Sequence, residues 1–388
     1  MKKRNPDKIR FSIIQLTFWC SWCSFTSFAA MYFQDKGLTE SQIGLAISLS
    51  TCGGIFGQFF WGFMCDRFRT IKKNFILANI LIWLSVMSFL FIKTSFFIII
   101  MMFALGFSQV PQPSILDTWI LKKLPDNEEE YGHIRLWASA GYGVFALIFG
   151  WVINKFGFRT MFIAASFFIG TTLIFAFRSE DAYDSRNKVR LKESFKILFS
   201  NREYLFFIFI CFTIGLAFRT THLLLPLIMN NVKGNSGHLG FAYFIGLMAE
   251  IPVLILSKKF AKRFKALTLI AFSCVLFTVH FIILYLTQSP FMVIVSMVAQ
   301  GLAFGNYLPV VRLFVYETAP EDLRTSAQTF QDAITSSLTA VIGSAAGGII
   351  IQNYGVGTVL LIGIGLLVFS LSVIIFKIAV LHGNKNFR

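Results

Sequence analysis

The chain has 388 residues, of which 56% are hydrophobic and 14% charged, and its mean hydropathy is +0.69. This composition excludes a soluble domain with an aqueous surface and indicates that the solvent is lipid. A net charge of +16 at pH 7 would be typical of nucleic-acid binding in a soluble protein. In a membrane protein it must first be compared with the distribution of Lys and Arg between the two sides.

The first apolar run, Phe11–Tyr32, follows a basic segment, as in a signal peptide. It is too long for one and lacks a small-residue cleavage site, so we expect it to stay as the first transmembrane helix. The chain has six cysteines, all within or at the ends of apolar runs, which argues against a disulfide framework. Cys20 and Cys23 form a CxxC on an apolar helix, where we expect plain buried thiols. No metal and no cofactor are expected.

Apolar runs long enough to span a bilayer, about 20 residues each, follow one another along the whole chain. We expect helices at Phe11–Tyr32, Ser41–Cys65, Asn74–Ile92, Phe96–Leu121, Ile134–Ile153, Phe158–Phe177, Tyr204–Met229, Leu239–Leu256, Ala266–Leu286, Phe291–Val315, Ser326–Ile351 and Val356–Phe376. The predicted fold class is therefore an all-α integral membrane protein with twelve transmembrane helices.

The 35 Lys and Arg residues test this segmentation independently. On the side of the N-terminus lie 27 of them, and five lie on the opposite side, namely Lys36, Lys93, Lys155, Arg159 and Lys233. The remaining three, Arg135, Arg219 and Arg312, fall inside spans. Because cytoplasmic loops carry the excess of positive charge, this asymmetry predicts a plasma or inner membrane protein with both termini in the cytoplasm. It also accounts for the net charge without nucleic acid.

The chain divides into two similar halves around one long polar segment. Residues 1–178 and 203–388 each hold six predicted helices, and residues 179–202 form the expected cytoplasmic linker. Residues 150–157 match residues 348–355 at an offset of 198, and residues 43–46 match 239–242 at an offset of 196. At the offset of 196, residues 66–69 also fall on residues 262–265. These matches predict two six-helix pseudo-repeated bundles, with a substrate site where the repeats meet.

The segment Gly62-Phe-Met-Cys-Asp66-Arg67-Phe-Arg69, with Lys72 and Lys73 after it, lies between the second and third predicted helices. Together with the six-plus-six arrangement, it resembles the major facilitator superfamily. In that family this loop runs Gly, three residues, Asp, a basic residue, any residue, Gly and further basic residues, and it takes part in the conformational switch. The resemblance therefore implies that role for Gly62, Asp66 and Arg67. Arg69 stands where the family has its second glycine, so we expect a different turn here.

Within the superfamily, residues 131–137 with Asp117 resemble the lactose permease branch and its phenylpropionate and nucleoside permease relatives. In that branch an acidic residue on the fourth helix and an arginine on the fifth bind substrate, which implies this role for Asp117 and Arg135. The residues at Arg135, Ser139 and Tyr142 are spaced i, i+4 and i+7, so one helical face would present a guanidinium, a hydroxyl and an aromatic ring.

Six charges lie within predicted spans, namely Asp117, Arg135, Arg219, Glu250, Arg312 and Asp332. A charge at mid-depth costs about 2.5–3.5 kcal/mol on insertion scales, so each is a functional hypothesis by default. The alternative is that opposite charges pair only to hold helices together.

The second half offers further polar faces. The eleventh predicted helix carries Gln328, Gln331, Asp332, Thr335 and Thr339 along one stripe. Arg219 and His222 mark a face of the seventh helix, with Glu250 and Arg312 as potential partners. We expect these faces to line the substrate cavity. A lone histidine, His280, is expected to be a hydrogen-bonded structural residue.

Proton coupling would need a carboxylate inside the membrane. Residues 299–305 lack the His and Glu that the lactose permease uses, so we expect Glu250 and Asp332 to be the proton carriers. Proton symport that imports a sugar-like, nucleoside or aromatic-acid substrate is the first choice. A proton antiporter that exports drugs is the alternative, although residues 140–143 lack the proline that exporters often carry.

Other classes of protein find less support. The sequence has no HExxH, P-loop or GxSxG motif, so we expect neither an enzyme nor an ATP-driven pump. A non-transporting receptor stays open, and its intramembrane charges would then be structural only. The expected partners are a small-molecule substrate, protons and the lipid bilayer, without nucleic acid, and we expect a monomer.

Overall fold

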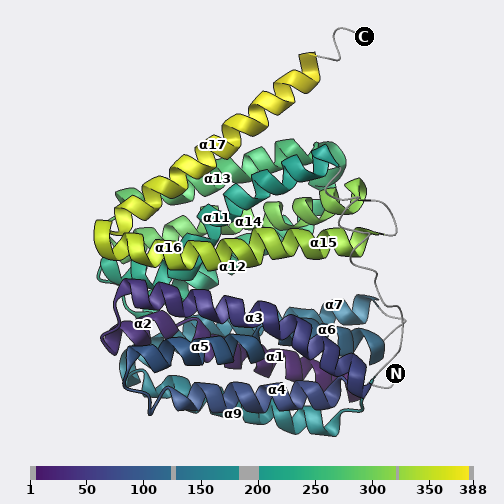
Figure 1. The fold of residues 1–388 in the computed structure, drawn as a ribbon, viewed down its shortest axis with the longest axis vertical. Coiled ribbons are helices and arrows are strands. Elements are labelled where there is room, and N and C mark those ends of the chain that lie inside the picture. The colour runs from purple at the N-terminus through teal and green to yellow at the C-terminus, as the bar shows by residue number, and fades with distance from the viewer. Residues whose placement is uncertain (1–5, 124–127, 183–200, 320–322, 384–388) are drawn as a thin grey trace. The chain divides into compact units, whose positions relative to one another are not determined.

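The fold was analysed in a computed structural model that describes residues 6–123, 128–182, 201–319 and 323–383. All of its elements in these ranges are helical (Figure 1). They are α1 (Pro6–Thr26), α2 (Ala29–Asp35), α3 (Glu40–Phe68), α4 (Lys72–Ser88), α5 (Ser95–Gln109), α6 (Gln112–Lys123), α7 (Glu128–Ser139), η1 (Ala140–Val144), α8 (Phe145–Phe156), α9 (Arg159–Arg178), α11 (Arg202–Asn231), α12 (Ser236–Arg263), α13 (Ala266–Leu286), α14 (Pro290–Thr318), α15 (Arg324–Asp332), η3 (Ala333–Leu338), α16 (Thr339–Tyr354) and α17 (Val356–Gly383).

Ten helical segments of the described residues are long and apolar enough to cross a membrane. The multi-span, all-α fold class expected from the sequence is thereby confirmed. The two remaining predicted spans correspond to α1 with α2 and to α4, which is 17 residues long. The count of twelve spans stays a prediction.

Two helices that were predicted to be continuous are each divided in the structure. The first predicted span divides between Thr26 and Ala29, where the Phe28 N–H bonds to the Phe25 carbonyl in a turn. The fourth divides between α5 and α6 at Pro111. Proline cannot donate the backbone hydrogen bond that continues a helix, and its ring clashes with the preceding turn. The break therefore follows from that residue.

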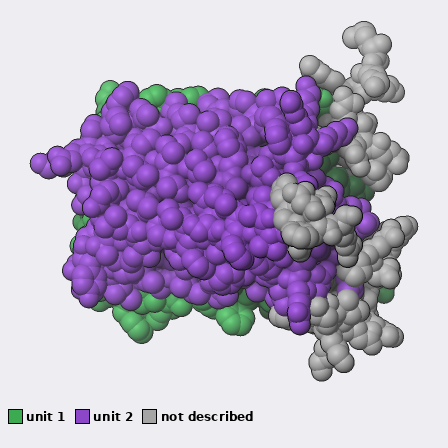
Figure 2. Space-filling view, turned by 90° about the horizontal axis from the view of Figure 1, so that it is seen from above, with its two compact units in different colours: residues 1–187, 235–244 green, residues 188–234, 245–388 purple. Residues whose placement is uncertain are grey.

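The helices form two compact units, and Figure 2 draws each in its own colour. Unit 1 comprises residues 1–187 with 235–244, and unit 2 comprises residues 188–234 with 245–388. Within unit 1, α3 packs closely on α5. A Cβ atom built at Gly57 would lie 2.0 Å from the Phe107 carbonyl oxygen, so only glycine permits this approach.

Matching contacts in the two units support the internal repeat. In unit 1, Thr17 on α1 shares a 2.7 Å hydrogen bond with Thr172 on α9. In unit 2, Thr213 on α11 shares a 2.7 Å hydrogen bond with Ser370 on α17. These pairs are related by 196 and 198 residues, the same offsets as the sequence matches.

The ends of α8 and α16 repeat as well. Gly157 follows α8 with φ +81°, and Gly355 follows α16 with φ +82°. Their N–H groups bond to the carbonyls of Ile153 and Ile351, again 198 residues apart. The left-handed backbone explains why both positions hold glycine. A π-helical stretch, η1 or η3, also precedes each of these two helices.

Candidate substrate site

A closed circuit of polar and aromatic contacts joins three helices of unit 1. Asp117 on α6 accepts a 3.0 Å hydrogen bond from the Gln15 amide on α1. Gln15 in turn accepts from the Trp19 indole N–H at 3.1 Å. The guanidinium of Arg135 on α7 lies over the Trp19 ring, 5.4 Å from its centroid, and its Nε lies 3.9 Å from Asp117 Oδ2. The structure thus brings Asp117 and Arg135 together through α1.

The ion pair in this circuit is loose. At 3.9 Å the Asp117 and Arg135 atoms are beyond hydrogen-bond distance. The side chains keep 27% and 42% of their surface exposed, respectively. Donors on the guanidinium and acceptors on the carboxylate therefore remain available to a third partner, which a tight structural pair would not allow.

Tyr142 reaches the same ring although the helical face is interrupted. The π-helical stretch η1 begins directly after Ser139, so the expected i, i+4, i+7 face does not continue as a regular α-helix. The Tyr142 ring nevertheless lies edge-on to Trp19 at 6.3 Å, and its hydroxyl accepts a 3.2 Å hydrogen bond from Ser27. Ser139 is half-buried at the last position of α7.

The contribution of α1 to this site was not predicted from the sequence. Gln15, Trp19 and Trp22 are spaced i, i+4 and i+7 and so share one face of α1. The Trp19 and Trp22 rings lie 5.5 Å apart. The available signal was Gln15, a polar amide inside an apolar run and in phase with two tryptophans.

In unit 2 the predicted charges gather around Asp332 without direct contact. Asp332 lies at the end of α15, within electrostatic range of Arg312 on α14 and Arg219 on α11. None of the ion pairs among the described residues joins them. His222, one turn after Arg219, packs its ring on Phe218 at 5.3 Å. Unit 2 therefore holds its charges apart, and Arg312 is exposed.

The amides of α15 are held differently. Gln328 donates to the Arg312 carbonyl at 2.5 Å, and Gln331 donates to the Thr335 hydroxyl at 2.6 Å. Gln331 is 4% exposed, and its Oε1 has no partner in the described structure. On α6 the Oε1 of Gln112 is likewise buried and unpartnered. An unsatisfied buried acceptor is costly.

Two other predicted residues can be placed plainly. Glu250 lies on α12, half-buried, and no ion pair among the described residues joins it to Asp332, Arg219 or Arg312. His280 is 3% exposed, and its Nδ1 lies 3.0 Å from the Ser296 carbonyl oxygen. The hydrogen bond expected for His280 is thus present, and its structural role stays a prediction.

The predicted switch residues Gly62, Asp66 and Arg67 lie within α3 rather than in a loop, because this helix continues to Phe68. The turn that follows is made by Arg69, whose φ of 51° is left-handed. Its N–H bonds to the Cys65 carbonyl. Arg69 thus takes the conformation for which the family motif uses glycine, at a steric cost.

Asp181, beyond the end of α9, stabilises this turn through hydrogen bonds. Its carboxylate accepts a hydrogen bond from the Thr70 hydroxyl, and it accepts from the backbone N–H groups of Ile71 at 3.1 Å and Lys72 at 3.0 Å. Partial burial raises the pKa of Asp181, but these hydrogen bonds outweigh it and hold the pKa below its usual range. Asp181 therefore caps the N-terminus of α4 together with the Thr70 hydroxyl, which accepts from the Lys73 N–H at 3.2 Å.

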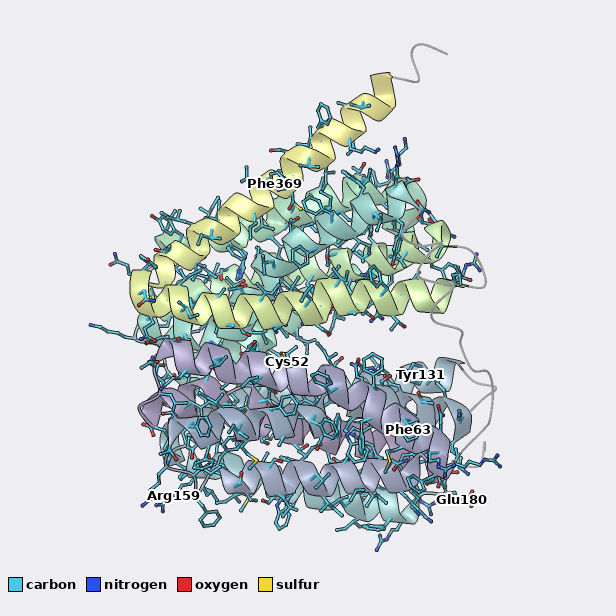
Figure 3. The ribbon with its side chains drawn as sticks, in the orientation of Figure 1. Cys52, Phe63, Tyr131, Arg159, Glu180 and Phe369 are labelled. Carbon is cyan, nitrogen blue, oxygen red and sulfur yellow. The ribbon has the colours of Figure 1, made fainter. Side chains whose placement is uncertain are left out.

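A buried tryptophan packs at the same end of unit 1. Trp119 is fully buried, packs edge-on against Phe11 at 5.3 Å, and donates from its indole N–H to the Glu180 carbonyl at 3.0 Å. The Glu180 carboxylate pairs with Lys123 at 2.8 Å, which lowers the pKa of Glu180. Glu180 and Tyr131 lie at the same end of the unit, and Arg159 lies at the other end (Figure 3).

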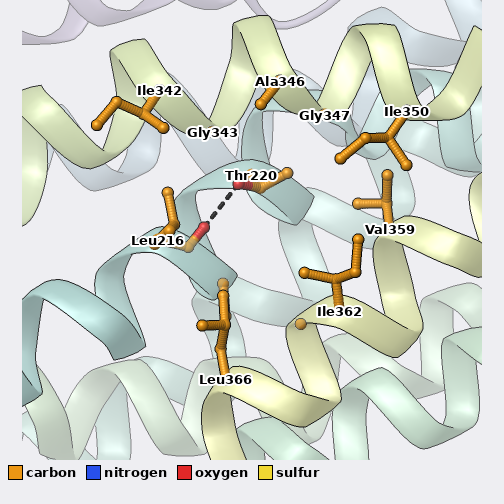
Figure 4. A pocket seen from close by; sticks show the side chains of 12 residues that line it. Leu216, Thr220, Ile342, Gly343, Ala346, Gly347, Ile350, Val359, Ile362 and Leu366 are labelled. Carbon is orange, nitrogen blue, oxygen red and sulfur yellow. Dashed lines mark hydrogen bonds between the residues drawn. The ribbon is translucent and has the colours of Figure 1, made fainter.

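A separate pocket of about 90 Å³ lies among α11, α16 and α17 in unit 2 (Figure 4). Its walls are aliphatic apart from Thr220, whose hydroxyl is already bonded to the Leu216 carbonyl at 2.6 Å. With no charged group in its lining, it does not fit a polar substrate.

The family model described as "MFS_1 like family" matches residues 8–362. Among curated proteins, the uncharacterized transporter YwbF of Bacillus subtilis is 26% identical over 338 residues, covering 86% of this chain and 84% of that protein. The maltose permease of Geobacillus stearothermophilus is 20% identical over 333 residues, with the same coverage. The probable 3-phenylpropionic acid transporter of Escherichia coli is 21% identical over 350 residues, covering 88% and 90%.

Solved structures share the fold. The nucleoside transporter NupG superposes with a TM-score of 0.85 at 16% identity and covers 96% of this chain and 98% of its own. A D-xylose-proton symporter superposes with a TM-score of 0.71 at 13% identity and covers 95% and 96%.

Proposed function

Because the chain belongs to the MFS_1 like family of the major facilitator superfamily, and is thus a multi-pass membrane transporter rather than an enzyme, we propose that it is a proton-coupled symporter. Its substrate would be a small sugar-like, nucleoside or aromatic-acid molecule, carried by alternating access. The circuit Asp117–Gln15–Trp19–Arg135 carries this proposal, because it combines exposed hydrogen-bonding groups with a flat aromatic surface.

The chemistry of the circuit ranks these substrates. The negative charge of its carboxylate balances the positive charge of its guanidinium, so the circuit offers hydrogen bonds without net charge. Hydroxyl groups of a neutral ligand can accept from Arg135 and donate to Asp117, while an apolar ring face stacks on Trp19 or Trp22. This arrangement favours a sugar or nucleoside over an aromatic acid, whose carboxylate would compete with Asp117 for the same guanidinium.

Proton coupling is assigned to unit 2. Glu250 and Asp332 are the carboxylates that the circuit does not use, and Asp332 lies within electrostatic range of two arginines. Protonation of either carboxylate changes the local charge balance in a low-dielectric region, where such changes are worth most. Arg219, His222, Arg312, Gln328 and Gln331 would contact the substrate from the same unit.

The topology proposal is that both termini lie in the cytoplasm of a plasma-membrane monomer. Single cysteines at Arg186, which lies outside the described residues, and at Lys36 would be labelled in sealed cells with an impermeant maleimide. The Lys and Arg distribution predicts external labelling at 36 only. External labelling at 186 would overturn the assigned orientation.

Transport is tested in proteoliposomes with [14C]maltose, [3H]uridine and [14C]3-phenylpropionate as probes. We expect accumulation of maltose or uridine under an inwardly directed proton gradient and its loss on addition of a protonophore. Accumulation only under the reversed gradient would instead identify the drug or metabolite exporter. Equilibrium binding without accumulation under either gradient would identify a receptor.

A further inference from the structure

A second, open site lies at one membrane end of unit 2. A hollow of about 450 Å³ is lined by α12, α13 and α14. Lys262 and Arg263, the last residues of α12, and Lys265, just before α13, line its rim. All three are exposed, and no ion pair among the described residues includes them. Arg263 lies over a neighbouring ring, that of Phe264, at 5.7 Å. The hollow thus presents a cluster of cations that no ion pair among the described residues neutralises.

The floor of the hollow is apolar. Val310, Leu313 and Phe314 are spaced i, i+3 and i+4 on α14 and share one helical face, which Leu269 of α13 meets. Leu313 keeps 39% of its surface exposed. Glu317, one turn further along the same face, stands at the edge of the hollow. With three cations and one carboxylate, the lining carries a net charge of +2.

The depth of the hollow in the membrane is set by its helices. The candidate membrane span of α12 ends at Ser257, that of α13 begins at Ala266 and that of α14 extends to Thr318. The basic rim therefore lies where the apolar spans end, at the level of lipid headgroups, and the floor begins inside the acyl-chain region.

The equivalent corner of unit 1 is built differently. There the carboxylate of Asp181 fastens the turn before α4, and Trp119 fills the interior. At the offset of 198 the position of Asp181 corresponds to Ala379 on α17, which has no carboxylate. The basic residues before α13 therefore have no internal anion of this kind, and an external one can take its place.

We propose that this hollow binds one anionic phospholipid, with its phosphate on Lys262, Arg263 and Lys265 and one acyl chain along the α14 face. A basic pocket between helices at a membrane surface suits a lipid phosphate. A free phosphate would satisfy the rim but leave the apolar floor in water, which disfavours it. A zwitterionic lipid would place its ammonium near Glu317 but would lose the net attraction of the +2 lining.

Native mass spectrometry of the detergent-solubilised full chain measures the affinity for a first molecule of palmitoyl-oleoyl phosphatidylglycerol. The triple variant Lys262→Gln, Arg263→Gln, Lys265→Gln should bind it about tenfold to a hundredfold more weakly. The matched control Arg178→Gln, Arg202→Gln, Lys259→Gln removes three exposed charges that do not line the hollow and should change the affinity less than about twofold. Equal losses in both variants would overturn the site in favour of diffuse surface attraction.

Two further variants identify the ligand. Leu313→Trp fills the floor without changing charge and should weaken phosphatidylglycerol binding, and Glu317→Gln should strengthen it by removing repulsion. If inorganic phosphate competes fully and Leu313→Trp has no effect, the site binds a free anion and the proposal fails. If phosphatidylethanolamine binds as tightly as phosphatidylglycerol and Glu317→Gln weakens it, the occupant is zwitterionic and the proposal also fails. Circular dichroism and elution volume confirm that each variant is folded.

Discussion

The two units repeat one helical frame but hold their intramembrane charges in different ways. In unit 1, Asp117 and Arg135 are joined by Gln15 and Trp19 into a continuous circuit of contacts. In unit 2, Asp332 interacts electrostatically with Arg312 and Arg219 without an ion pair to either in the described structure. The frame itself does not require either arrangement, because the hydrogen bonds at Thr17 and Thr213 are equivalent.

This difference suits the two units to different tasks, substrate binding in unit 1 and the response to a proton in unit 2. A preorganised circuit needs little rearrangement when substrate arrives, which favours binding. Charges held apart in a low-dielectric region respond strongly to a proton, which favours coupling. We infer that duplication supplied two copies of a scaffold and that proton transfer was then placed in unit 2, whose polar residues also contribute to substrate binding.

The largest expected effect concerns unit 2. Glu250→Gln or Asp332→Asn should abolish proton-driven accumulation in proteoliposomes while leaving counterflow of labelled substrate intact, because exchange needs no net proton release. The two assays on the same vesicles provide the comparison. Uphill uptake with wild-type pH dependence in both variants would remove the proton role from unit 2.

A smaller effect is expected from the aromatic surface of unit 1. Trp19→Leu removes the ring on which Arg135 lies and should weaken substrate binding about tenfold. Trp137→Leu is the matched control, because Trp137 is 47% exposed on α7 and takes no part in the circuit. Titration calorimetry on both variants measures the difference, and equal affinities would contradict a stacking role for Trp19.

The membrane end of unit 1 gives a pH-dependent prediction. Asp181→Asn should destabilise the purified protein by about 1 kcal/mol at pH 7, as for a lost helix N-cap. The pKa of Asp181 is lowered by folding, so its contribution is present above the unfolded pKa of about 4 and is lost as the pH falls through the lower folded value.

Thermal unfolding of wild type and Asp181→Asn between pH 7 and pH 3 measures this effect. The difference between their midpoints should shrink at the acid end. Glu180→Gln serves as the control, since Glu180 is an exposed partner of Lys123 and such pairs contribute little. A midpoint difference that stays constant over the whole range would show that Asp181 is not acting through its charge.

The smallest effect is expected at the turn after α3. Arg69→Gly should stabilise the protein by up to about 1 kcal/mol, because glycine adopts the left-handed backbone without strain. Arg67→Gly, two residues earlier but inside the helix, should destabilise it by about the same amount. Thermal unfolding of the pair checks the opposite signs, and shifts in the same direction would contradict the strain at Arg69.

The fold was predictable because its signals are local. Hydropathy and polar punctuation placed α13 at Ala266–Leu286, as the structure has it, and the repeat offset of 198 reappears in the caps at Gly157 and Gly355. The break between Thr26 and Ala29 carries no proline or glycine, so the sequence gives no warning of it.

The site was predictable only in part. Charges inside spans pointed to Asp117 and Arg135, because lipid makes such residues costly. Trp19 was missed because an aromatic residue in an apolar run is equally expected to face lipid. The carboxylate of Asp181 was missed because its partner, Thr70, lies 111 residues away, and only the packing of α9 beside α4 brings the two together.

Substrate affinity in the double variant Asp117→Asn, Arg135→Gln tests the central claim most directly. Removing both charges at once leaves neither unpaired, so the variant should insert and fold. With whichever of maltose, uridine or 3-phenylpropionate the wild type accumulates, titration calorimetry should show binding weakened by about 100-fold or more, since two charge-assisted contacts are lost. An affinity near that of wild type would contradict the account, because the pair would then be structural and the circuit on α1, α6 and α7 would not be the substrate site.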